Sequence, residues 1–352
     1  MSKVPPWILL VATGAGNTVQ GGADIWVNNF LKEVWPNLPN NRYYRLLIDS
    51  KRPGNFKDES LPKNLKFHFH FDDPEITRKW GNESEWLHFL HPHYHMREHI
   101  WEFEDKFGIC FVHAYPKDMK DVSKQLPELD RLQFQTKVDE RFYSEFLMTC
   151  KRRIWIGLNG SQLLKDLPNY TYTIPNYYEF KGPAQLTTHV DNGSVGFAAR
   201  AETRKCLHWM NGIEKGYALT GQYDVQNLRD TTSFTLKTTN MYQWEPGIYN
   251  AFMGKSWGIF HGAYFREPFG YSIFQALDYG KLPIINKDWC SEVDYKYRVA
   301  TKNEFDGCIK QILKDSHETR VEERNKLIKF LKRYDNKKVW ADKIRTQILS
   351  FY

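Results

Sequence analysis

The sequence has no long apolar run, no cysteines at metal-binding spacing and little alanine. No run in its 352 residues approaches the roughly 20 apolar residues of a membrane-spanning helix, so a transmembrane segment is not expected. Its five cysteines lie apart without C-x-x-C spacing, which implies neither a disulfide framework nor a zinc site. The first residues lead straight into an apolar strand and show no small-residue cleavage site, so we expect no secretory signal. Without repeats or low-complexity stretches either, the chain is predicted to be a cytoplasmic globular protein.

The chain instead has length, aromatic side chains and positive charge. A chain of 352 residues can form two domains with separate cores. Aromatic residues make up 16% of the sequence, and the formal net charge is +7. A modest positive balance suits a nucleic acid, an anionic membrane surface or a phosphorylated small molecule, and it does not separate these partners.

Residues 266–285 form the most informative stretch. The sequence REPFGYSIFQALDYGKLPII predicts a Gly-containing turn, a short apolar helix and a buried strand. We expect Gly280 to end the helix in the left-handed conformation that glycine adopts at low cost. The N–H groups at the start of such a helix, together with its dipole, favour a bound anion such as phosphate. An ordinary strand–helix–strand unit without a ligand is the alternative.

A second strand–turn–helix pattern lies at the beginning of the chain. Residues 7–12 predict a buried strand, residues 13–22 a Gly-rich loop and residues 23–35 a helix with apolar residues at helical spacing. This order is typical of nucleotide-binding folds, although a turn that simply needs glycine would look the same.

Glu267-Pro268-Phe269-Gly270, followed by Ala276 and Gly280, resembles the E-x-F-G…E-A…G signature of group 1 (family 4) glycosyltransferases. Those are retaining enzymes of the GT-B fold, in which two Rossmann-like domains face a cleft and a C-terminal helix crosses back to the first domain. In the family a second acidic residue stands eight positions after the first, whereas this chain has Gln275. A glutamine can still accept a hydrogen bond from a ribose hydroxyl, but it carries no charge.

The resemblance implies a site shared by the two domains. Glu267 would hold sugar hydroxyls, and Arg200 and Lys205 would neutralise the departing diphosphate, with His113 beside the donor sugar. The family usually has glycine where Cys206 follows Lys205. The base of the nucleotide tends to lie at the Gly turn that here is Gly221. The remaining donor-binding residues would be Gly21, Gly22, Phe269, Gly270, Tyr271, Ser272 and Gln275.

The resemblance also implies the domain limits. Residues 1–180 would be the acceptor-side domain, residues 181–338 the nucleotide-sugar domain and residues 339–352 the crossing helix. Residues 170–176 resemble the strand and I-P-N segment that closes the first domain, and residues 179–193 are the best linker candidate.

Eight of the twelve histidines lie between His68 and His113. The run His91-Pro92-His93-Tyr94-His95 could bind a divalent metal, because alternate residues of an extended segment share one face. We favour instead an aromatic-rich insertion that lies in or over the cleft and stacks on a sugar or an extruded base. Packing of this segment into the core is the remaining alternative. No metal site is predicted.

The donor is expected to be a nucleoside diphosphate sugar, in particular a UDP-sugar. Frequent Lys, Asn and aromatic residues are typical of phage and AT-rich bacterial proteins, and with the positive charge they favour 5-hydroxymethylcytosine in double-stranded phage DNA as the acceptor. Such an enzyme would act in the host cytoplasm. A lipopolysaccharide or capsule intermediate is the competing acceptor, and a non-catalytic nucleotide-sugar-binding protein is the competing class. The sequence does not predict an oligomeric state.

Overall fold

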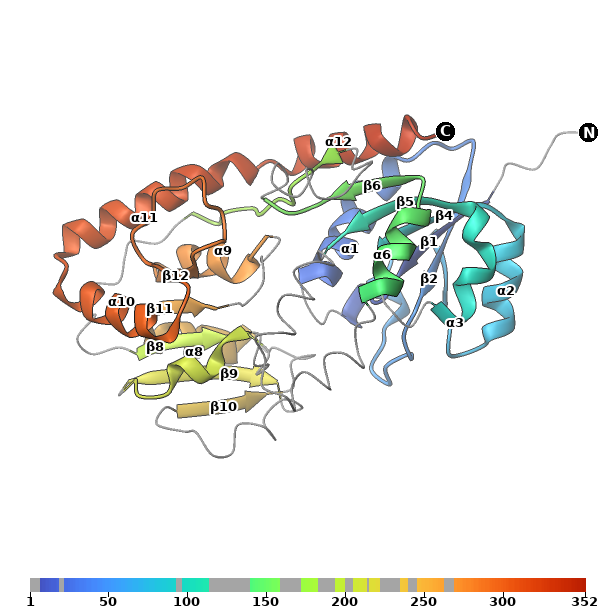
Figure 1. Cartoon of the computed structure of the whole chain (residues 1–352). Helices are drawn as coiled ribbons and strands as arrows, with labels where there is room; N and C mark the ends of the chain where they lie inside the picture. The colour runs from blue at the N-terminus through green and yellow to red at the C-terminus, as the bar shows by residue number, and fades with distance from the viewer. Residues whose placement is uncertain are drawn as a thin grey trace, which may run out of the picture. The chain divides into compact units, whose positions relative to one another are not determined.

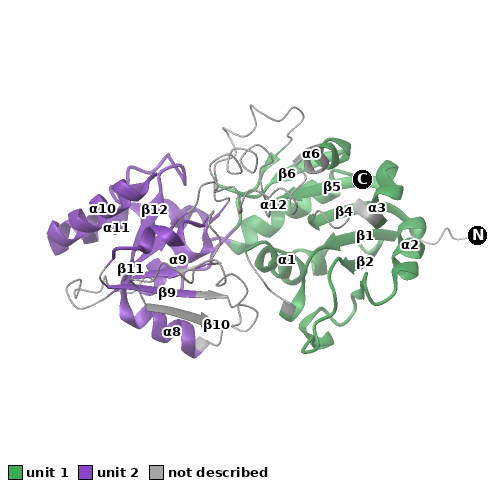
Figure 2. Cartoon of the chain, turned by 60° about the horizontal axis from the view of Figure 1, so that its bottom comes forward, with its two compact units in different colours: residues 1–120, 133–176, 337–352 green, residues 121–132, 177–336 purple. Residues whose placement is uncertain are grey.

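The protein, as a computed structural model, consists of two α/β units (Figure 1). It describes residues 7–18, 22–92, 97–113, 140–158, 172–182, 194–199, 205–213, 215–221, 235–239, 246–262 and 269–352. Unit 1 comprises residues 1–120, 133–176 and 337–352, and unit 2 comprises residues 121–132 and 177–336 (Figure 2). The chain therefore returns to unit 1 after completing unit 2.

The described residues of unit 1 form a parallel sheet of seven strands in the order β3-β2-β1-β4-β5-β6-β7. Its strands are β1 (Trp7–Ala12), β2 (Tyr43–Ile48), β3 (Lys66–Phe69), β4 (Ser84–His91), β5 (Phe107–Val112), β6 (Arg152–Trp155) and β7 (Tyr172–Thr173). Its helices are α1 (Gly22–Glu33), α2 (Pro74–Glu83), α3 (Arg97–Ile100), α6 (Glu140–Thr149) and α12 (Lys337–Leu349), with 3-10 turns η1 (Gly16–Thr18), η2 (Trp35–Asn37), η3 (Asp58–Ser60) and η5 (Trp101–Lys106).

The described residues of unit 2 form a second parallel sheet, of six strands in the order β10-β9-β8-β11-β12-β13. Its strands are β8 (Ser194–Ala198), β9 (Gly216–Gly221), β10 (Thr235–Thr239), β11 (Ser256–His261), β12 (Leu282–Asn286) and β13 (Arg298–Val299). Its helices are α8 (Pro246–Lys255), α9 (Tyr271–Asp278), α10 (Lys302–Lys314) and α11 (His317–Leu331), with 3-10 turns η7 (Leu207–Met210) and η10 (Lys332–Tyr334).

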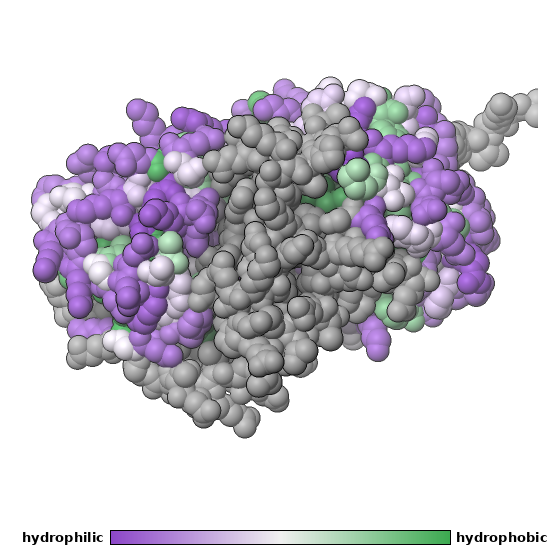
Figure 3. All heavy atoms as spheres, in the orientation of Figure 1, coloured by the Kyte–Doolittle hydropathy of each residue, from purple (hydrophilic) through white to green (hydrophobic). Residues whose placement is uncertain are grey.

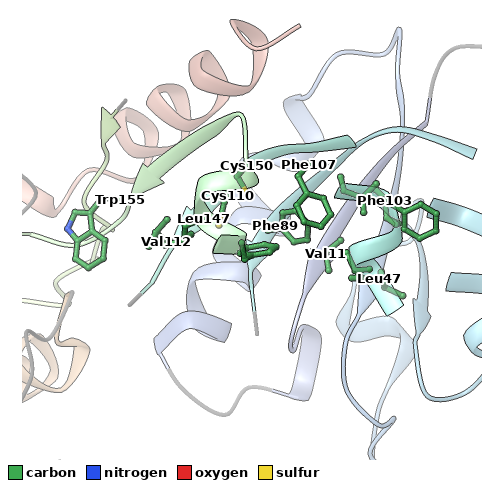
Figure 4. Close-up of a cluster of buried hydrophobic side chains, with 14 residues drawn as sticks. Val11, Leu47, Phe89, Phe103, Phe107, Cys110, Val112, Leu147, Cys150 and Trp155 are labelled. Atoms are coloured by element: carbon green, nitrogen blue, oxygen red, sulfur yellow. The ribbon is translucent and has the colours of Figure 1, made fainter. Parts of the chain in front are cut away.

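The central strands are apolar because both faces of each parallel sheet are covered. Residues 8–12 of β1 and all of β5 are buried. Figure 4 shows the side chains that β4 and β5 contribute to the core of unit 1 together with α6. Within this cluster Phe89, Phe107 and Phe146 lie with ring centroids 4.7–5.4 Å apart.

The histidine- and aromatic-rich segment is part of this core, which corrects the prediction of an insertion over the cleft. Residues 84–91 form β4, which pairs with β1 on one side and β5 on the other. Phe89 is fully buried, and Trp80 and Trp101 pack against the same cluster. Core packing, the alternative left open by the sequence, is therefore what these residues do. His93, Tyr94 and His95 lie outside the described residues.

The C-terminal helix packs on unit 1. In α12, Trp340, Ile344 and Ile348 are buried, and the Trp340 ring meets the Trp26 ring of α1 edge-on at 6.0 Å. A helix that follows unit 2 in sequence thus completes the core of unit 1, as the resemblance implied.

The outer surface is mostly polar. In the view of Figure 3 the coloured residues are largely hydrophilic, with hydrophobic residues in small areas. Within the described parts of the chain, every helix is too short or too polar to span a membrane.

Candidate functional site

Each sheet reverses its strand order next to its first strand. In unit 1 the chain leaves β1 for β2 on one side and later returns to β4 on the other, so the reversal lies between β1 and β4. In unit 2 it lies between β8 and β11. Loops at the carboxyl ends of the two strands diverge at such a point and leave a crevice in which α/β proteins bind ligands. The candidate site of each unit is therefore built on these strand ends.

The loop after β1 is held in a fixed conformation. The side-chain amide of Asn28 accepts a hydrogen bond from the Gly16 N–H at 2.7 Å and donates one to the Gly16 carbonyl at 2.8 Å. Gly16 has φ of +63°, and a Cβ there would lie 2.3 Å from Ser60 Oγ. Helix α1 then begins at Gly22, whereas Gly21 lies outside the described residues. The segment predicted to approach the diphosphate thus ends at a helix N-terminus at the reversal point.

Two histidines and an aspartate lie at the carboxyl ends of β4 and β5. His91, the last residue of β4, places Nδ1 3.3 Å from Oδ1 of Asp24, which is buried in the first turn of α1. The His91 carbonyl accepts a hydrogen bond from the Thr13 hydroxyl, which follows β1. The His91 and His113 rings lie 5.0 Å apart.

His113 follows β5 at the strand end where the sequence placed it. Its Nε2 lies 2.7 Å from the Leu90 carbonyl oxygen, which can only accept a hydrogen bond, so Nε2 carries the proton. Burial holds the pKa of His113 well below its usual value, with the neighbouring His91 adding to the effect. Trp26 contacts the ring edge-on at 5.3 Å. His113 is therefore neutral and offers Nδ1 as a hydrogen-bond acceptor.

A second histidine–aspartate pair lies beyond β2 and β3. His99 Nε2 is 2.9 Å from Oδ1 of Asp49, whose side chain is fully buried. The His99 ring stacks on His70 with centroids 3.4 Å apart, and His70 Nδ1 lies 3.0 Å from the Thr77 hydroxyl. Burial, reinforced by His99, lowers the pKa of His70 to about 4. No group of three metal-ligating side chains occurs among the residues that the structure describes.

In unit 2 the predicted charged residues follow the two strands of the reversal point. Arg200 comes soon after β8 and Glu267 comes soon after β11, and both lie outside the described residues. Lys205 is half-buried, and a Cβ at Gly262, just after β11, would lie 2.9 Å from its carbonyl oxygen. The backbone of the segment bearing Lys205 therefore lies against the end of β11.

Cys206 adopts the backbone conformation for which glycine is usual. Its φ is 60° and its ψ is 26°, and its side chain is fully buried. A left-handed conformation costs a non-glycine residue about 1–2 kcal/mol. Cysteine in place of the usual glycine at position 206 therefore adds a buried side chain, but the backbone still makes the left-handed turn.

Helix α9 begins at a glycine and has no side-chain cap. Gly270 has φ of 78° and occupies the N-cap position, and a Cβ there would lie 2.9 Å from Trp289 Nε1. Ser272, in the first turn, contacts His261 Nδ1 at 2.6 Å through its hydroxyl. A helix start whose N-cap residue supplies no side-chain hydrogen bond is a place where backbone N–H groups can bind an anion, and the anion site stays a prediction here.

The other end of α9 also follows the prediction. Helix α9 ends at Asp278, and Gly280 has φ of 68°. The Lys281 N–H donates to the Ala276 carbonyl at 2.8 Å, the bond that closes a Schellman motif. Glycine at position 280 therefore turns the chain from α9 into β12.

Gln275, which replaces the second acidic residue, is bound by a tyrosine. The Tyr249 hydroxyl of α8 donates to Gln275 Oε1 at 3.0 Å. The amide oxygen thus already accepts one of its two possible hydrogen bonds, and the amide nitrogen, a donor only, is a second group that can contact a ligand. Gly221 ends β9 opposite Thr239 of β10.

Arg298 fixes the loop that supports the start of α9. Its guanidinium donates to the carbonyls of Lys287, Trp289, Cys290 and Val293. From this loop Trp289 Nε1 donates to the Phe269 carbonyl at 3.2 Å. The arginine therefore acts on the α9 N-terminus through the loop.

The substitution Arg298→Lys should lower the free energy of unfolding of unit 2 by about 1–3 kcal/mol. The single ammonium group of lysine cannot donate to all four carbonyls that the two terminal nitrogens of the guanidinium bind. Urea unfolding followed by fluorescence would measure it. Arg345→Lys, which changes an exposed residue paired with Asp342, is the matched control and should shift the midpoint little. Equal shifts of the urea midpoint in the two variants would contradict a special stabilising role for the four hydrogen bonds of Arg298.

Sequence reasoning proposed His113 and the α9 segment as candidates, which stay predictions, but it named His91 only within the histidine run and did not name Asp24. His91 ends the stretch Trp86-Leu87-His88-Phe89-Leu90, which is mostly apolar and could have been read as a strand with a polar residue at its tip. Asp24 gave no signal, because an acidic residue in a first helical turn is common whatever its role.

The sequence matches no protein-family model, and no curated protein matches it. Solved structures do match its fold. An α,α-trehalose-phosphate synthase (UDP-forming) from Burkholderia vietnamiensis is similar with a TM-score of 0.59 at 11% identity, over 97% of this chain and 99% of that one. The E. coli trehalose-6-phosphate protein bound with UDP-2-fluoro glucose gives 0.58 at 9% identity, over 97% and 98%.

A lipopolysaccharide outer core galactosyltransferase is also similar, with a TM-score of 0.54 at 11% identity, over 98% of this chain and 99% of that one. These identities are too low to carry over residues or substrates. They confirm the predicted GT-B fold, two Rossmann-like units with a C-terminal helix on the first.

Proposed function

We propose that the protein transfers a sugar from a nucleoside diphosphate sugar, in particular a UDP-sugar, to a hydroxyl group. The observation that carries this proposal is the α9 N-terminus at the strand reversal of unit 2, uncapped by a side chain and preceded by Glu267. A helix start of this kind binds phosphate oxygens through backbone N–H groups. The similar E. coli protein is bound with UDP-2-fluoro glucose, which supports the same donor class here.

In this proposal unit 2 binds the donor. Backbone groups at Phe269, Gly270, Tyr271 and Ser272 hold the diphosphate, and Arg200 and Lys205 neutralise the charge that grows on it as the glycosidic bond breaks. Glu267 holds sugar hydroxyls. Gln275 contacts the ribose through its amide nitrogen, and Gly221 borders the base.

Unit 1 binds the acceptor in this proposal. Gly21 and Gly22 let its backbone approach the reacting groups, and His113 accepts a hydrogen bond from the donor sugar at Nδ1. The resemblance implies that the product keeps the anomeric configuration of the donor. Front-face attack assisted by the leaving phosphate accounts for retention without a protein nucleophile. No metal takes part in these roles.

For the acceptor we propose 5-hydroxymethylcytosine in double-stranded DNA, in the cytoplasm of a phage-infected cell. The net charge of +7 and the high content of Lys, Asn and aromatic residues support this choice. The similarity to a lipopolysaccharide galactosyltransferase favours the second candidate, a surface-polysaccharide intermediate.

Mass spectrometry separates these acceptors. Hydroxymethylated and unmodified DNA are incubated with a panel of nucleotide sugars, and a hexose or pentose increment on hydroxymethylated DNA alone identifies donor and acceptor together. Transfer only to a lipid-linked oligosaccharide would replace DNA by the second candidate. Binding of a nucleotide sugar without transfer to either acceptor would make the protein a non-catalytic binder.

Replacing Glu267 with alanine should lower kcat/KM of sugar transfer about ten- to hundredfold, because a charged acceptor of sugar hydroxyl protons is lost. A coupled assay of UDP release in the presence of the acceptor would measure it. Glu318→Ala, at an exposed position on α11, is the control and should leave the rate unchanged. Unchanged transfer by Glu267→Ala would remove this residue from the mechanism.

A further inference from the structure

Two imidazoles lie beside the strand reversal of unit 1, at the carboxyl ends of β4 and β5, and each can offer a nitrogen that accepts a hydrogen bond. His91 points Nδ1 at the buried carboxylate of Asp24 at 3.3 Å. Because an ionised carboxylate only accepts, this contact favours the tautomer of the neutral His91 ring that has its proton on Nδ1 and a lone pair on Nε2. His113 donates from Nε2 to the Leu90 carbonyl, so its Nδ1 is likewise an acceptor.

The position of His91 sets it apart from the other histidines at this sheet edge. Its ring lies 5.0 Å from that of His113, its side chain is 20% exposed, and its Nε2 makes no hydrogen bond within the described residues. Its carbonyl is fixed by the Thr13 hydroxyl of the loop after β1. Backbone and ring are therefore both held at the place where the fold binds ligands.

We propose that Nε2 of His91 accepts the hydrogen bond of the attacking acceptor hydroxyl, and that Asp24 is the positioning residue that keeps His91 in the required tautomer. The inference rests on the proposed function and adds to it the residue that receives the acceptor. A neutral imidazole suits this task, since it accepts the hydrogen bond of the hydroxyl without adding the negative charge that a carboxylate would bring.

In the proposed step each bond that forms is matched by one that breaks, and His91 has the same protonation state before and after it. The acceptor oxygen forms a bond to the anomeric carbon while the bond from that carbon to the diphosphate oxygen breaks, and the electron pair leaves with the diphosphate. The hydroxyl hydrogen points at Nε2 of His91 while the acceptor binds, and it passes to the departing phosphate oxygen as the new bond to the anomeric carbon forms, as front-face displacement requires. His91 orients the hydroxyl lone pair, and its own proton stays on Nδ1 beside Asp24. Such orientation contributes by keeping the reacting atoms aligned.

The test compares His91→Phe, which keeps a ring but removes the acceptor nitrogen, with His91→Gln, whose amide oxygen can accept a hydrogen bond at a similar reach. With UDP-glucose and a hydroxymethylated double-stranded oligonucleotide as probes, we expect His91→Phe to lower kcat/KM for the oligonucleotide about ten- to hundredfold. His91→Gln should recover most of that loss. The Kd of UDP-glucose, measured by calorimetry, should stay within about twofold for both variants.

Two further variants separate this role from structural support. Asp24→Ala should lower kcat/KM like His91→Phe, because the ring then populates the wrong tautomer. His99→Phe alters the other histidine–aspartate pair of the same sheet edge and should leave transfer unchanged. Equal activity of His91→Phe and wild type, or equal loss in His91→Phe and His91→Gln with an unchanged melting temperature, would overturn the proposal. If wild type binds UDP-glucose but transfers to no hydroxyl acceptor, the proposed function fails, and this inference fails with it.

Discussion

Lowering the pH from 7 to 5 is expected to reduce the free energy of unfolding of unit 1 by about 2 kcal/mol for each of His70 and His88, with His113 acting in the same direction. Burial lowers the pKa of His70 to about 4 and of His88 to about 3, and that of His113 lies well below its usual value. Below pH 6.5 these side chains take up protons in the unfolded chain but not in the folded one. Stability is therefore complete above about pH 6.5 and falls as the pH drops towards the folded pKa values.

The contacts of His88 show why the folded state resists protonation. Its Nδ1 accepts a hydrogen bond from the Ile109 N–H at 3.1 Å, and its Nε2 lies 2.8 Å from the Tyr352 hydroxyl. A second proton on Nδ1 would break the bond to Ile109 inside the core. His70 likewise faces His99, His68 and the carboxylate of Asp49, and its proton would lie beside a stacked ring.

Urea unfolding at pH 7, 6 and 5 would measure how steeply the free energy of unfolding depends on pH. In His70→Gln the fall in the free energy of unfolding between pH 6 and 5 should be smaller than in wild type by about 1.2 kcal/mol, because the unfolded side chain is already partly protonated at pH 6. The comparison uses slopes, so a constant loss of stability from the substitution itself does not affect it. If the free energy of unfolding of His70→Gln depends on pH as steeply as that of wild type, His70 is not held in its neutral form in the folded protein.

Replacing Gly270 with alanine should lower the free energy of unfolding of unit 2 by about 2–5 kcal/mol. The left-handed conformation at φ of 78° costs alanine about 1–2 kcal/mol. The new Cβ would lie 2.9 Å from Trp289 Nε1 and 3.0 Å from Ile273 Cδ1, and crowding of this kind costs about 1–3 kcal/mol more. Since these atoms define the α9 N-terminus, we expect the affinity for UDP-glucose to fall at least about tenfold as well.

Gly212→Ala is the matched control for this substitution. Gly212 has φ of 86° in the same unit, but a Cβ there would meet no atom within 4 Å. It should show the backbone cost alone and no change in donor binding. Thermal unfolding and calorimetry on both variants therefore separate strain from crowding, and equal effects of the two variants on UDP-glucose affinity would contradict an anion site at Gly270.

Sequence patterns correctly predicted those elements whose conformation depends mainly on residues close together in the chain. The β1 strand, the α9 helix and the left-handed Gly280 follow from apolar runs and from glycine chemistry within a few positions. The fold class followed from the resemblance carried by residues 266–285. Strand β4 was missed, because its run of apolar and histidine residues gains its meaning only from β1 and β5 on either side.

The contacts that shape the site depend on residues far apart in sequence. Asp24 meets His91 across 67 positions, and Tyr249 meets Gln275 across 26. The four hydrogen bonds of Arg298 depend on the backbone conformation of the loop whose carbonyls accept them, and no pattern of side chains in the sequence shows that conformation. The turn at Cys206 shows the same limit, because a cysteine there gives no sign of a left-handed conformation.

The packing of Trp340 on Trp26 also sets an order of events during synthesis. A growing chain exposes Trp26 before any of the segment 177–336 is made, whereas Trp340 emerges only after all of unit 2 has left the ribosome. Until then the apolar face of α1 lacks the neighbour that covers it in the finished protein. Unit 2, a continuous segment apart from residues 121–132, has no such delay. The unit made first is therefore the one whose core closes last, and it is the unit that chaperones would have to shield for longest.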